Sequence, residues 1–455
     1  MKLASASESD PSANLAKPAG NRFSAANWAL VAVLATINFT HILDFVIIMP
    51  LGDQLRRQLG INPQQFGFVV SAYGIAAMFA GIAASAVVDR FDRKRVLLVA
   101  FAGFVLATLG CGLADDYAQL VVARASAGLF GGVTAAGVLA IIADVFPPQQ
   151  RGKAIGAVTS SFAVASTIGL PVGLSLANAF DDFGAAFLAI AALGVPVWGL
   201  AWWRLPSLTA HRTSAHANPL TQFFAVVRQP NHLISFAFML AMVLGTFIIV
   251  PYMAPYLQAN CGRQASDLPI IYAVAGIASL VTMNVFGLLT DRLGPRPVFL
   301  FTAGGAVLMT LVITNLPDVG LWSATAALGG FMVLASGRVI PAQAMMLTSA
   351  DPELRGAFTN LTSAVSHLAT GTGPLIAGAI VGEACPGGPL THYGTAGLVA
   401  ACFGIAAIGL SLLLRAAPLK PRDSAEIVVP NQPALLSIDP EPVRIDDAQR
   451  LTLPE

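Results

Sequence analysis

The segment Trp28–Leu51, WALVAVLATINFTHILDFVIIMPL, is apolar and long enough to cross a bilayer, yet it contains a carboxylate. About 20 apolar residues, each rising ~1.5 Å in a helix, span the ~30 Å of hydrocarbon. Asn38, His41 and Asp44 recur every three residues, which predicts one polar stripe. A carboxylate at this depth costs at least ~2.5–3.5 kcal/mol, so Asp44 requires a partner or a water-filled cavity. We interpret Asp44 as a functional residue of a pathway through the membrane. The alternative is that Asp44 has only a packing or folding role and finds its polar partner on a neighbouring helix.

The composition places the whole chain in the membrane class. Of its 455 residues, 56% are hydrophobic and 11% are charged, and the mean hydropathy is +0.72. Soluble proteins carry about 25% charged residues, so soluble enzymes are excluded. The formal net charge of +1 gives no indication of nucleic-acid binding. No cysteine pair has metal-ligand spacing and no span holds an H-E-x-x-H or G-x-S-x-G motif, so we expect no enzyme activity, metal or cofactor.

Twelve apolar spans are expected, and together they predict an all-α membrane protein. They lie approximately at 28–51, 66–88, 96–113, 117–144, 154–177, 183–204, 232–257, 268–289, 297–315, 321–347, 356–381 and 393–414. The longest internal polar segment, 205–231, divides them into two six-helix bundles, 28–204 and 232–414. Residues 1–27 and 415–455 are polar or rich in proline, so they are predicted to be disordered tails.

The distribution of lysine and arginine predicts the orientation of these spans. With the N-terminus inside, nearly all loop lysines and arginines fall in inner segments, and the outer loops hold Arg56, Arg57 and Arg263. We therefore expect both tails and the linker 205–231 to be cytoplasmic, with Arg56 and Arg57 as a local exception. The lead-in has no signal-peptide pattern. The expected location is a bacterial inner membrane, with the chain as a multi-pass monomer in the lipid bilayer.

The two halves of the chain repeat each other. Three pairs of markers recur: Asp89–Arg95 with Asp291–Pro297, Arg151–Gly152 with Arg355–Gly356, and Pro171 with Pro374. Their offsets are 202, 204 and 203 residues, which chance rarely produces three times. Duplicated halves of this kind place a substrate site at the interface between the two bundles.

The loop after the second span gives the chain its family resemblance. It reads Ser85-Ala-Val-Val-Asp89-Arg90-Phe-Asp92-Arg93-Lys-Arg, and it is similar to the Gly-x-x-x-Asp-Arg-x-Gly-Arg-Arg/Lys signature of the major facilitator superfamily. Both glycines of the signature are replaced here, by Ser85 and Asp92, whereas the second copy after span eight keeps them. The resemblance covers Trp28–Leu414 and implies the major facilitator fold of two pseudo-symmetric six-helix bundles.

The resemblance also implies a conformational gate at the cytoplasmic ends of the bundles. Asp89 with Arg90 would face the start of span eleven and hold the bundles together while the cavity opens outward. Asp144 and Arg151 would join this network, and Asp291 with Arg292 form the second copy of the motif. The simpler alternative is a set of positive-inside anchors.

Three further segments resemble proton-coupled antiporters of this superfamily. Arg124–Gly132 is similar to their Arg-x-x-x-Gly element, Gly169-Leu-Pro171-Val-Gly173 to their glycine–proline motif, and Leu43–Asp44 to their Leu-Asp element. Asp44 and Arg124 each lie seven residues from the outer end of their span, ~10 Å below the surface, and the resemblance implies that both spans border the central cavity. We therefore expect Arg124 to face Asp44 and sense its charge, Asp44 to carry the coupling proton, and His41 to relay it. Gly169, Pro171 and Gly173 would form a bend about which the bundles rock, although close packing alone also explains glycines four residues apart.

Several polar residues in other spans are candidates for the substrate cavity. Asn38 belongs to the first span, and Asn360, Ser363, His367 and Thr370 form one polar face on span eleven. Arg338 lies deep in span ten, where it either lines the cavity or bonds helix carbonyls. Tyr252 is either an interfacial anchor or a ligand contact. Cys261 and Cys385 lie in outer loops and are a possible disulfide pair.

These features predict a proton-coupled exporter that exchanges a small molecule for protons by alternating access. Asp44 is the one carboxylate well inside a span, whereas Arg124 and Arg338 are both cations there. A neutral, amphipathic or anionic substrate therefore fits better than a multiply charged cation. An uncoupled facilitator and a transporter-shaped receptor remain open alternatives.

The predicted orientation can be tested by labelling single cysteines. We expect Asp182→Cys to react with an impermeant reagent from outside and Arg212→Cys from inside. Reversed accessibility of the two positions would overturn the assignment of inner and outer ends.

Overall fold

The computed structural model describes residues 23–87, 91–206 and 219–417. These residues belong to one compact unit, which ends at Ala417. Asp89 and Arg90 of the predicted gate, and most of the two predicted tails, lie outside the described residues.

Long helices make up the first half of the chain. They are α1 (Ala25–Ile47), α3 (Pro63–Val87), α4 (Arg93–Gly112), α5 (Tyr117–Val145) and α9 (Phe183–Arg204), with the short α2 (Gly52–Leu59) between α1 and α3. The predicted fifth span is built from four consecutive pieces: α6 (Pro148–Thr159), α7 (Ser161–Val164), a π-helical segment (Ala165–Gly169) and α8 (Leu170–Phe180).

The second half repeats this plan with two interrupted spans. Its elements are α10 (Pro219–Val227), α11 (Pro230–Phe247), α12 (Val250–Ala259), a short 3₁₀ turn (Ala265–Asp267), α13 (Leu268–Leu293), α14 (Pro295–Thr314), α15 (Leu321–Gly337), α16 (Val339–Ser349), α17 (Arg355–Ile380) and α18 (Tyr393–Leu413). Strands β1 (Gly382–Glu383) and β2 (Leu390–Thr391) form an antiparallel hairpin between α17 and α18. Helix α10 lies inside the predicted linker.

Local sequence signals explain several helix ends. The Asp92 carboxylate caps α4 by accepting a hydrogen bond from the Lys94 amide at 3.0 Å, so the residue that replaces a signature glycine satisfies a helix N-terminus. In the second copy, Gly294 separates α13 from α14 with φ = +86°. Glycine adopts this backbone conformation without the steric cost that a side chain would add.

Eleven helical segments in the described part of the chain are long and apolar enough to cross a membrane. Helix α17 is long enough but is not among them, and its first half carries the predicted polar face. Its length and its place between two apolar segments nevertheless match the predicted eleventh span.

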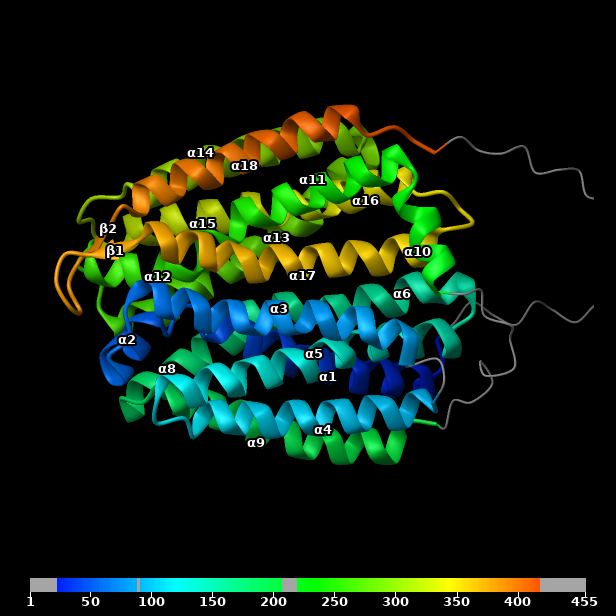
Figure 1. Cartoon of the computed structure of the whole chain (residues 1–455), viewed down its shortest axis with the longest axis horizontal. Coiled ribbons are helices and arrows are strands. Elements are labelled where there is room, and N and C mark those ends of the chain that lie inside the picture. Colours follow the sequence, from blue (N-terminus) through cyan, green and yellow to red (C-terminus); the bar gives the residue numbers. More distant parts are fainter. Residues whose placement is uncertain (1–22, 88–90, 207–218, 418–455) are drawn as a thin grey trace, which may run out of the picture. The chain divides into compact units, whose positions relative to one another are not determined.

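Helices α3 and α17 come from different halves and run side by side (Figure 1). A Cβ atom on Gly67 would lie 2.5 Å from the Pro374 carbonyl oxygen, and one on Gly74 would lie 2.7 Å from the Gly371 Cα. Only glycine therefore permits this separation between the two backbones. These contacts involve the turns of both helices nearest α2 and β1, so the halves are closed at that end of the molecule, which we call the α2 end.

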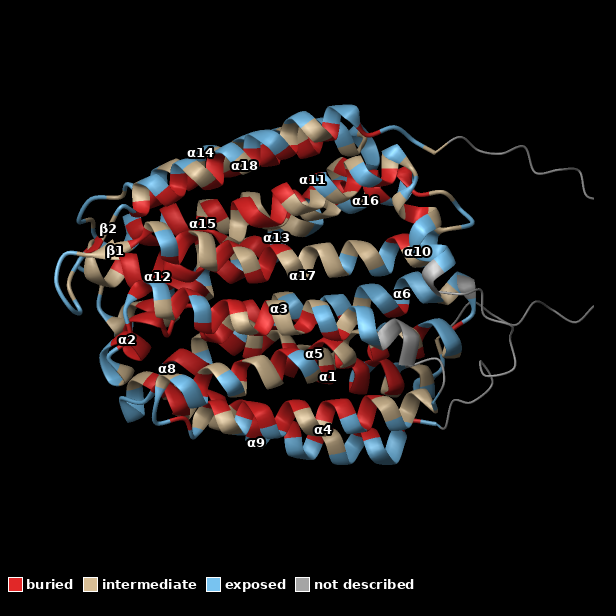
Figure 2. Ribbon diagram, in the orientation of Figure 1, coloured by how far each residue is buried: buried red, intermediate tan, exposed pale blue. Residues whose placement is uncertain are grey.

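The same face of α17 is more exposed toward the opposite end, where α10 lies (Figure 1). Asn360, His367 and Pro374 are seven residues apart, about two helical turns, and so share one face. Asn360 is exposed and His367 is half-buried, whereas the next turns pack on α3. Figure 2 shows that the buried part of α17 is concentrated near β1. The halves are thus closed at the α2 end and separate toward the α10 end.

Candidate functional site

A buried ion pair connects α1 and α5. An Arg124 Nη atom lies 2.9 Å from a carboxylate oxygen of Asp44, and both side chains are fully buried. The same nitrogen donates to the Asp44 carbonyl at 3.2 Å. Thr108 of α4 donates to the other carboxylate oxygen at 3.0 Å. The predicted contact between Asp44 and Arg124 is confirmed, and the carboxylate has the partner that its depth requires.

Aromatic rings surround the remaining atoms of Arg124. The centre of its guanidinium lies 4.6 Å from the centroid of the Tyr73 ring and 5.8 Å from that of Phe187. Its Nε and second Nη have no hydrogen-bond partner among the described residues. Ring faces attract a cation but do not neutralise it. The charge of Arg124 is therefore balanced by Asp44.

The predicted single stripe of Asn38, His41 and Asp44 is wrong. The Asn38 amide donates to Ser161 at 2.8 Å and to the Val158 carbonyl at 3.2 Å, so it joins α1 to span five. Asp44 instead faces α4 and α5. Three residues turn a helix by about 300°, which is ~60° short of a full turn. The side chains of Asn38, His41 and Asp44 therefore point in directions ~60° apart and contact different neighbours.

His41 lies near the junction of the two halves. Its ring is 5.8 Å from that of Phe104 and 6.0 Å from that of Tyr73. Neither ring nitrogen has a hydrogen-bond partner among the residues that the structure describes. Phe45, one turn along α1 from His41, contacts Phe247 of the other half with ring centroids 5.8 Å apart. His41 is thus a buried polar group with both nitrogens available.

The glycine–proline segment of span five packs directly against the helix that carries Asp44. A Cβ on Gly169 would lie 2.8 Å from Leu43, and one on Gly173 would lie 2.8 Å from Ile47. Pro171 stands in the first turn of α8, directly after the π-helical segment. Such π-helical turns interrupt regular hydrogen bonding and occur often at functional sites. The segment is therefore irregular where a bend is predicted, and its glycines allow it to approach α1 on both sides of Asp44.

The polar face of α17 differs along its length. Asn360 and Ser363 are exposed, His367 is half-buried and Thr370 is buried. The hydroxyl groups of Ser363 and Thr370 bond carbonyls of their own helix at 3.1 and 2.9 Å. Asn360 and Ser363 are thus the cavity candidates that solvent reaches in this conformation.

Arg338 and Tyr252 both make specific contacts inside the protein. Arg338 stands at the break between α15 and α16, is 4% exposed, and donates to the Met242 carbonyl at 3.2 Å and to Thr246. The carbonyl-bonding alternative is therefore what the structure shows. Tyr252 is fully buried, and its hydroxyl donates to the Pro63 carbonyl at 2.6 Å. It joins the halves and is not an interfacial anchor.

Two residues of the predicted gate make specific contacts within the first half. Asp144 pairs with Arg93 at 2.7 Å, and Arg151 donates through Nε to the Phe146 carbonyl at 2.9 Å. The centre of the predicted network, Asp89 and Arg90, lies outside the described residues, so the network stays a prediction. Asp291 and Arg292 are exposed at the end of α13.

The two outer-loop cysteines are not bridged. Cys261 and Cys385 are both free, and the Cys261 thiol donates to the Leu316 carbonyl at 3.4 Å. Burial, with the nearby Asp318 carboxylate, raises the pKa of Cys261 to about 11. Few thiolates are therefore present at neutral pH, and thiolate is the form that reacts.

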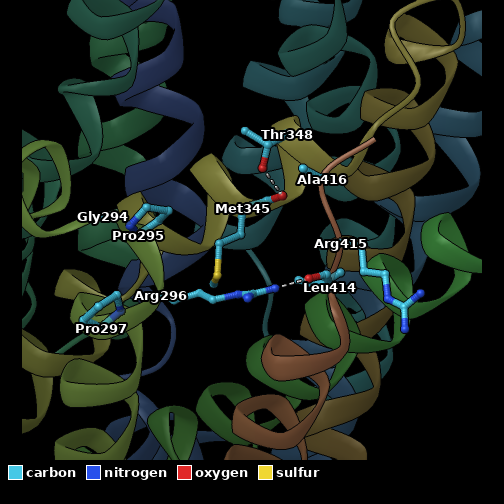
Figure 3. Close-up of a pocket in the computed structure, with 9 residues that line it drawn as sticks. All are labelled: Gly294, Pro295, Arg296, Pro297, Met345, Thr348, Leu414, Arg415 and Ala416. Carbon is cyan, nitrogen blue, oxygen red and sulfur yellow. Dashed lines mark hydrogen bonds between the residues drawn. The ribbon is translucent and has the colours of Figure 1, made fainter. Parts of the chain in front are cut away.

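A pocket of about 350 Å³ lies apart from these residues, between the α13–α14 turn, α16 and the end of α18 (Figure 3). Arg296 reaches across it to the Leu414 carbonyl. None of the predicted site residues lines it.

Comparisons with known proteins identify the family. A family model described as Major Facilitator Superfamily matches residues 34–335 and 236–442. The chain belongs to the Major Facilitator Superfamily. This transporter is 25% identical over 356 residues to an uncharacterised MFS-type transporter, YceJ of Bacillus subtilis, covering 77% of this chain and 88% of the relative. It is 27% identical over 346 residues to the multidrug resistance protein MdtG of Proteus mirabilis, covering 73% and 84%.

Solved structures agree with the fold of this transporter. A bacterial homologue of the human lysosomal transporter Spinster, in an inward-facing and occupied conformation, has a TM-score of 0.70 at 15% identity and covers 86% of this chain and 97% of its own. A D-xylose–proton symporter has a TM-score of 0.70 at 14% identity, covering 84% and 97%. The predicted all-α fold of twelve transmembrane helices in two bundles is confirmed.

Sequence reasoning missed three residues at the ion pair: Thr108, Tyr73 and Phe187. Thr108 is a polar residue near the end of an apolar helix, a weak signal that many membrane helices share. Tyr73 lies on the face of α3 that packs against Gly128 of α5. The rotation of each helix decides these contacts, and the low amphipathicity of buried spans leaves that rotation undetermined from sequence.

Removing one member of the ion pair should destabilise the protein. Arg124→Leu leaves Asp44 buried without its counter-charge, and breaking a buried pair costs about 3–5 kcal/mol. We expect a clearly lower thermal unfolding midpoint in detergent and a partial recovery in the Asp44→Asn/Arg124→Leu double variant. Arg57→Leu is the control, because the Arg57 side chain is 56% exposed and pairs with Asp53 one turn away on the same helix, where such pairs contribute about 0.3–0.5 kcal/mol. Equal unfolding midpoints for Arg124→Leu and the parent protein would contradict the conclusion that Asp44 and Arg124 neutralise each other.

Proposed function

We propose that this protein is a proton-coupled secondary active transporter that exports a small neutral, amphipathic or anionic molecule in exchange for protons. The observation that carries the proposal is the fully buried Asp44–Arg124 pair. Ionisable groups inside membrane spans are expensive to maintain and mark ion or substrate pathways. A carboxylate with a single counter-charge is suited to bind and release one proton.

Protonation of Asp44 changes the charge of the site from neutral to positive. Arg124 then retains one backbone carbonyl and the faces of Tyr73 and Phe187. A net charge in a low-dielectric interior is costly, so the protonated site favours a conformation in which Arg124 reaches water or substrate. The proton thereby shifts the balance between two conformations, as coupling requires. His41, one turn from Asp44 with both nitrogens available, is the proposed relay.

The conformation supports loading from the α10 end, which the positive-inside pattern assigns to the cytoplasm. At this end a Cβ on Gly152, Gly156 or Gly356 would meet no atom within 4 Å. The exposed Asn360 and Ser363 would contact substrate first, with His367 deeper. In the proposed cycle this end closes through Asp89 and Arg90 with their partners in the gate, while the Gly169–Gly173 segment bends. A monomer in a bacterial inner membrane, with both termini cytoplasmic, suffices for this cycle.

The balance of charges supports the substrate class. Asp44 is neutralised by Arg124, and Arg338 is held by one helix carbonyl and a hydroxyl. The remaining polar face of α17 has one ionisable residue, His367, and it offers no carboxylate to a cation. The likeness to a multidrug resistance protein supports export of amphipathic molecules.

The carboxylate of Asp44 should be required for coupling and not for binding. In inverted vesicles, we expect Asp44→Asn to abolish substrate uptake driven by a pH gradient while substrate binding persists and no longer varies with pH. Asp115→Asn, which changes an exposed carboxylate, should transport normally. Undiminished gradient-driven uptake in Asp44→Asn would reject the proposal and direct attention to His41 and His367.

The gate residue Asp89 should act on conformation and not on substrate contact. Asp89→Asn is expected to slow transport severely while the protein remains folded and still binds substrate. Transport at the parent rate would show that this loop is only an anchor.

A further inference from the structure

The two adjacent arginines of α2 have opposite environments. Arg57 has a side chain that is 56% exposed and pairs with Asp53 one turn away at 2.9 Å. The Arg56 side chain is 2% exposed and pairs with Glu383, which lies in the other half of the chain. Arginine loses strong hydration when buried, so such a position requires a specific contact. The burial of Arg56 therefore accounts for one of the two exceptions to the positive-inside pattern.

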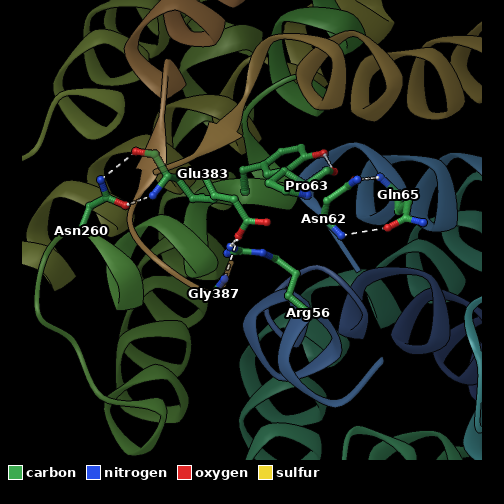
Figure 4. A network of polar contacts seen from close by, with 9 residues as sticks. Arg56, Asn62, Pro63, Gln65, Asn260, Glu383 and Gly387 are labelled. Carbon is green, nitrogen blue, oxygen red and sulfur yellow. Dashed lines mark hydrogen bonds and ion pairs between the residues drawn. The ribbon is translucent and has the colours of Figure 1, made fainter. Parts of the chain in front are cut away.

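A small hairpin presents Glu383 to Arg56 (Figure 4). Glu383 pairs with Leu390 across the β1–β2 ladder, and its carboxylate also accepts a hydrogen bond from the Gly387 amide at 3.0 Å. Asn260, just beyond α12, donates to the Leu390 carbonyl and accepts from the Leu390 amide, both at 2.9 Å. The carboxylate is thus held in place by the C-terminal half, and its orientation does not depend on Arg56.

The pair is the one ion pair that joins the two halves within the part of the chain that the structure describes. Neutral contacts accompany it at the same end: the hydroxyl of Tyr252 on the Pro63 carbonyl, and Asn178 of α8 on the Ala265 carbonyl at 2.8 Å. Together with the glycine contacts between α3 and α17, they close the α2 end.

The arrangement is also reversible. The Nε and one Nη atom of Arg56 have no hydrogen-bond partner among the described residues. A buried donor without a partner is destabilising, and it gains hydrogen bonds when water reaches it. Opening the α2 end therefore loses the ion pair but hydrates two donors and a carboxylate. The contact holds the closed state without making it permanent.

We propose that Arg56 and Glu383 form an outer lock that makes the state open at the α10 end the resting state, so that substrate loads from that side. The direction of loading rests on the proposed function; the lock itself does not. Loss of either charge should raise the population that is open at the α2 end. Arg57, whose contacts stay within its own helix, should have no such effect.

Accessibility of Ser71 provides the test. Ser71 lies on α3 between Gly67 and Gly74, is fully buried, and its hydroxyl has no hydrogen-bond partner among the described residues. In the full chain with the four native cysteines replaced by serine, Ser71→Cys is exposed to an impermeant maleimide from outside intact cells. We expect Arg56→Gln and Glu383→Gln each to increase its labelling rate several-fold, and Arg57→Gln to leave the rate unchanged. The charge exchange Arg56→Glu/Glu383→Arg should return the rate toward that of the parent.

Two results would overturn the outer lock. One is an unchanged labelling rate in Glu383→Gln, whose half-buried carboxylate tolerates an isosteric amide even if Arg56→Gln fails to fold. The other is an equal increase in Arg57→Gln. The labelling needs neither substrate nor a proton gradient, so it remains valid if the Asp44→Asn result rejects proton coupling. If labelling of Ser71→Cys changes as expected but the protein shows no gradient-driven transport, the outer lock is supported and the proposed function is rejected.

Discussion

The fold depends on the need to neutralise charge in a medium without water. A carboxylate in hydrocarbon requires a partner, and Asp44 obtains one from a helix 80 residues later in the chain. The contact requires α1, α4 and α5 to approach closely: a Cβ on Gly131 of α5 would lie 2.9 Å from the His41 ring of α1, while Gly128 and Gly132 of α5 pack against α3. Gly169 and Gly173 permit the same approach from span five. The ion pair thus determines where small residues are needed, and the small residues determine how closely the helices of the first half pack.

The contacts that join the two halves differ in kind from the contacts inside each half. At the α2 end the halves meet through glycine contacts, a tyrosine hydroxyl and one ion pair. These contacts are individually weak in energy, and two donors of Arg56 beside the ion pair have no partner among the described residues. Such an interface separates at modest cost, because water compensates for each lost contact. The interior of each half has no such compensation, so a rigid-body movement of the halves costs less than any rearrangement within them.

The hydropathy of the spans and the repeat at about 203 residues were sufficient to predict the fold, because the bilayer constrains length and composition strongly. The positions of Asp44 and Arg124 in their spans predicted that they lie at a similar depth, and the resemblance added that their helices face each other. Helix rotation is what the sequence left undetermined: it separated Asn38 from Asp44 and brought Thr108 and Tyr73 to the pair. The sequence predicts Arg56 only as a local exception, because a residue count records how many charges a loop holds and not whether they are buried.

The polarity of α17 has a consequence for biosynthesis. A helix with Asn360, Ser363, His367 and several threonines enters a bilayer less readily than the eleven apolar segments, since each polar side chain opposes insertion. Its stabilising surfaces, α3 and α11, are synthesised earlier and are already in the membrane when it emerges. Insertion of α17 therefore relies on helices present before it and on the strongly apolar α18 that follows. Substitutions that weaken the α3–α17 contact would reduce the yield of correctly inserted protein before they affect any step of transport.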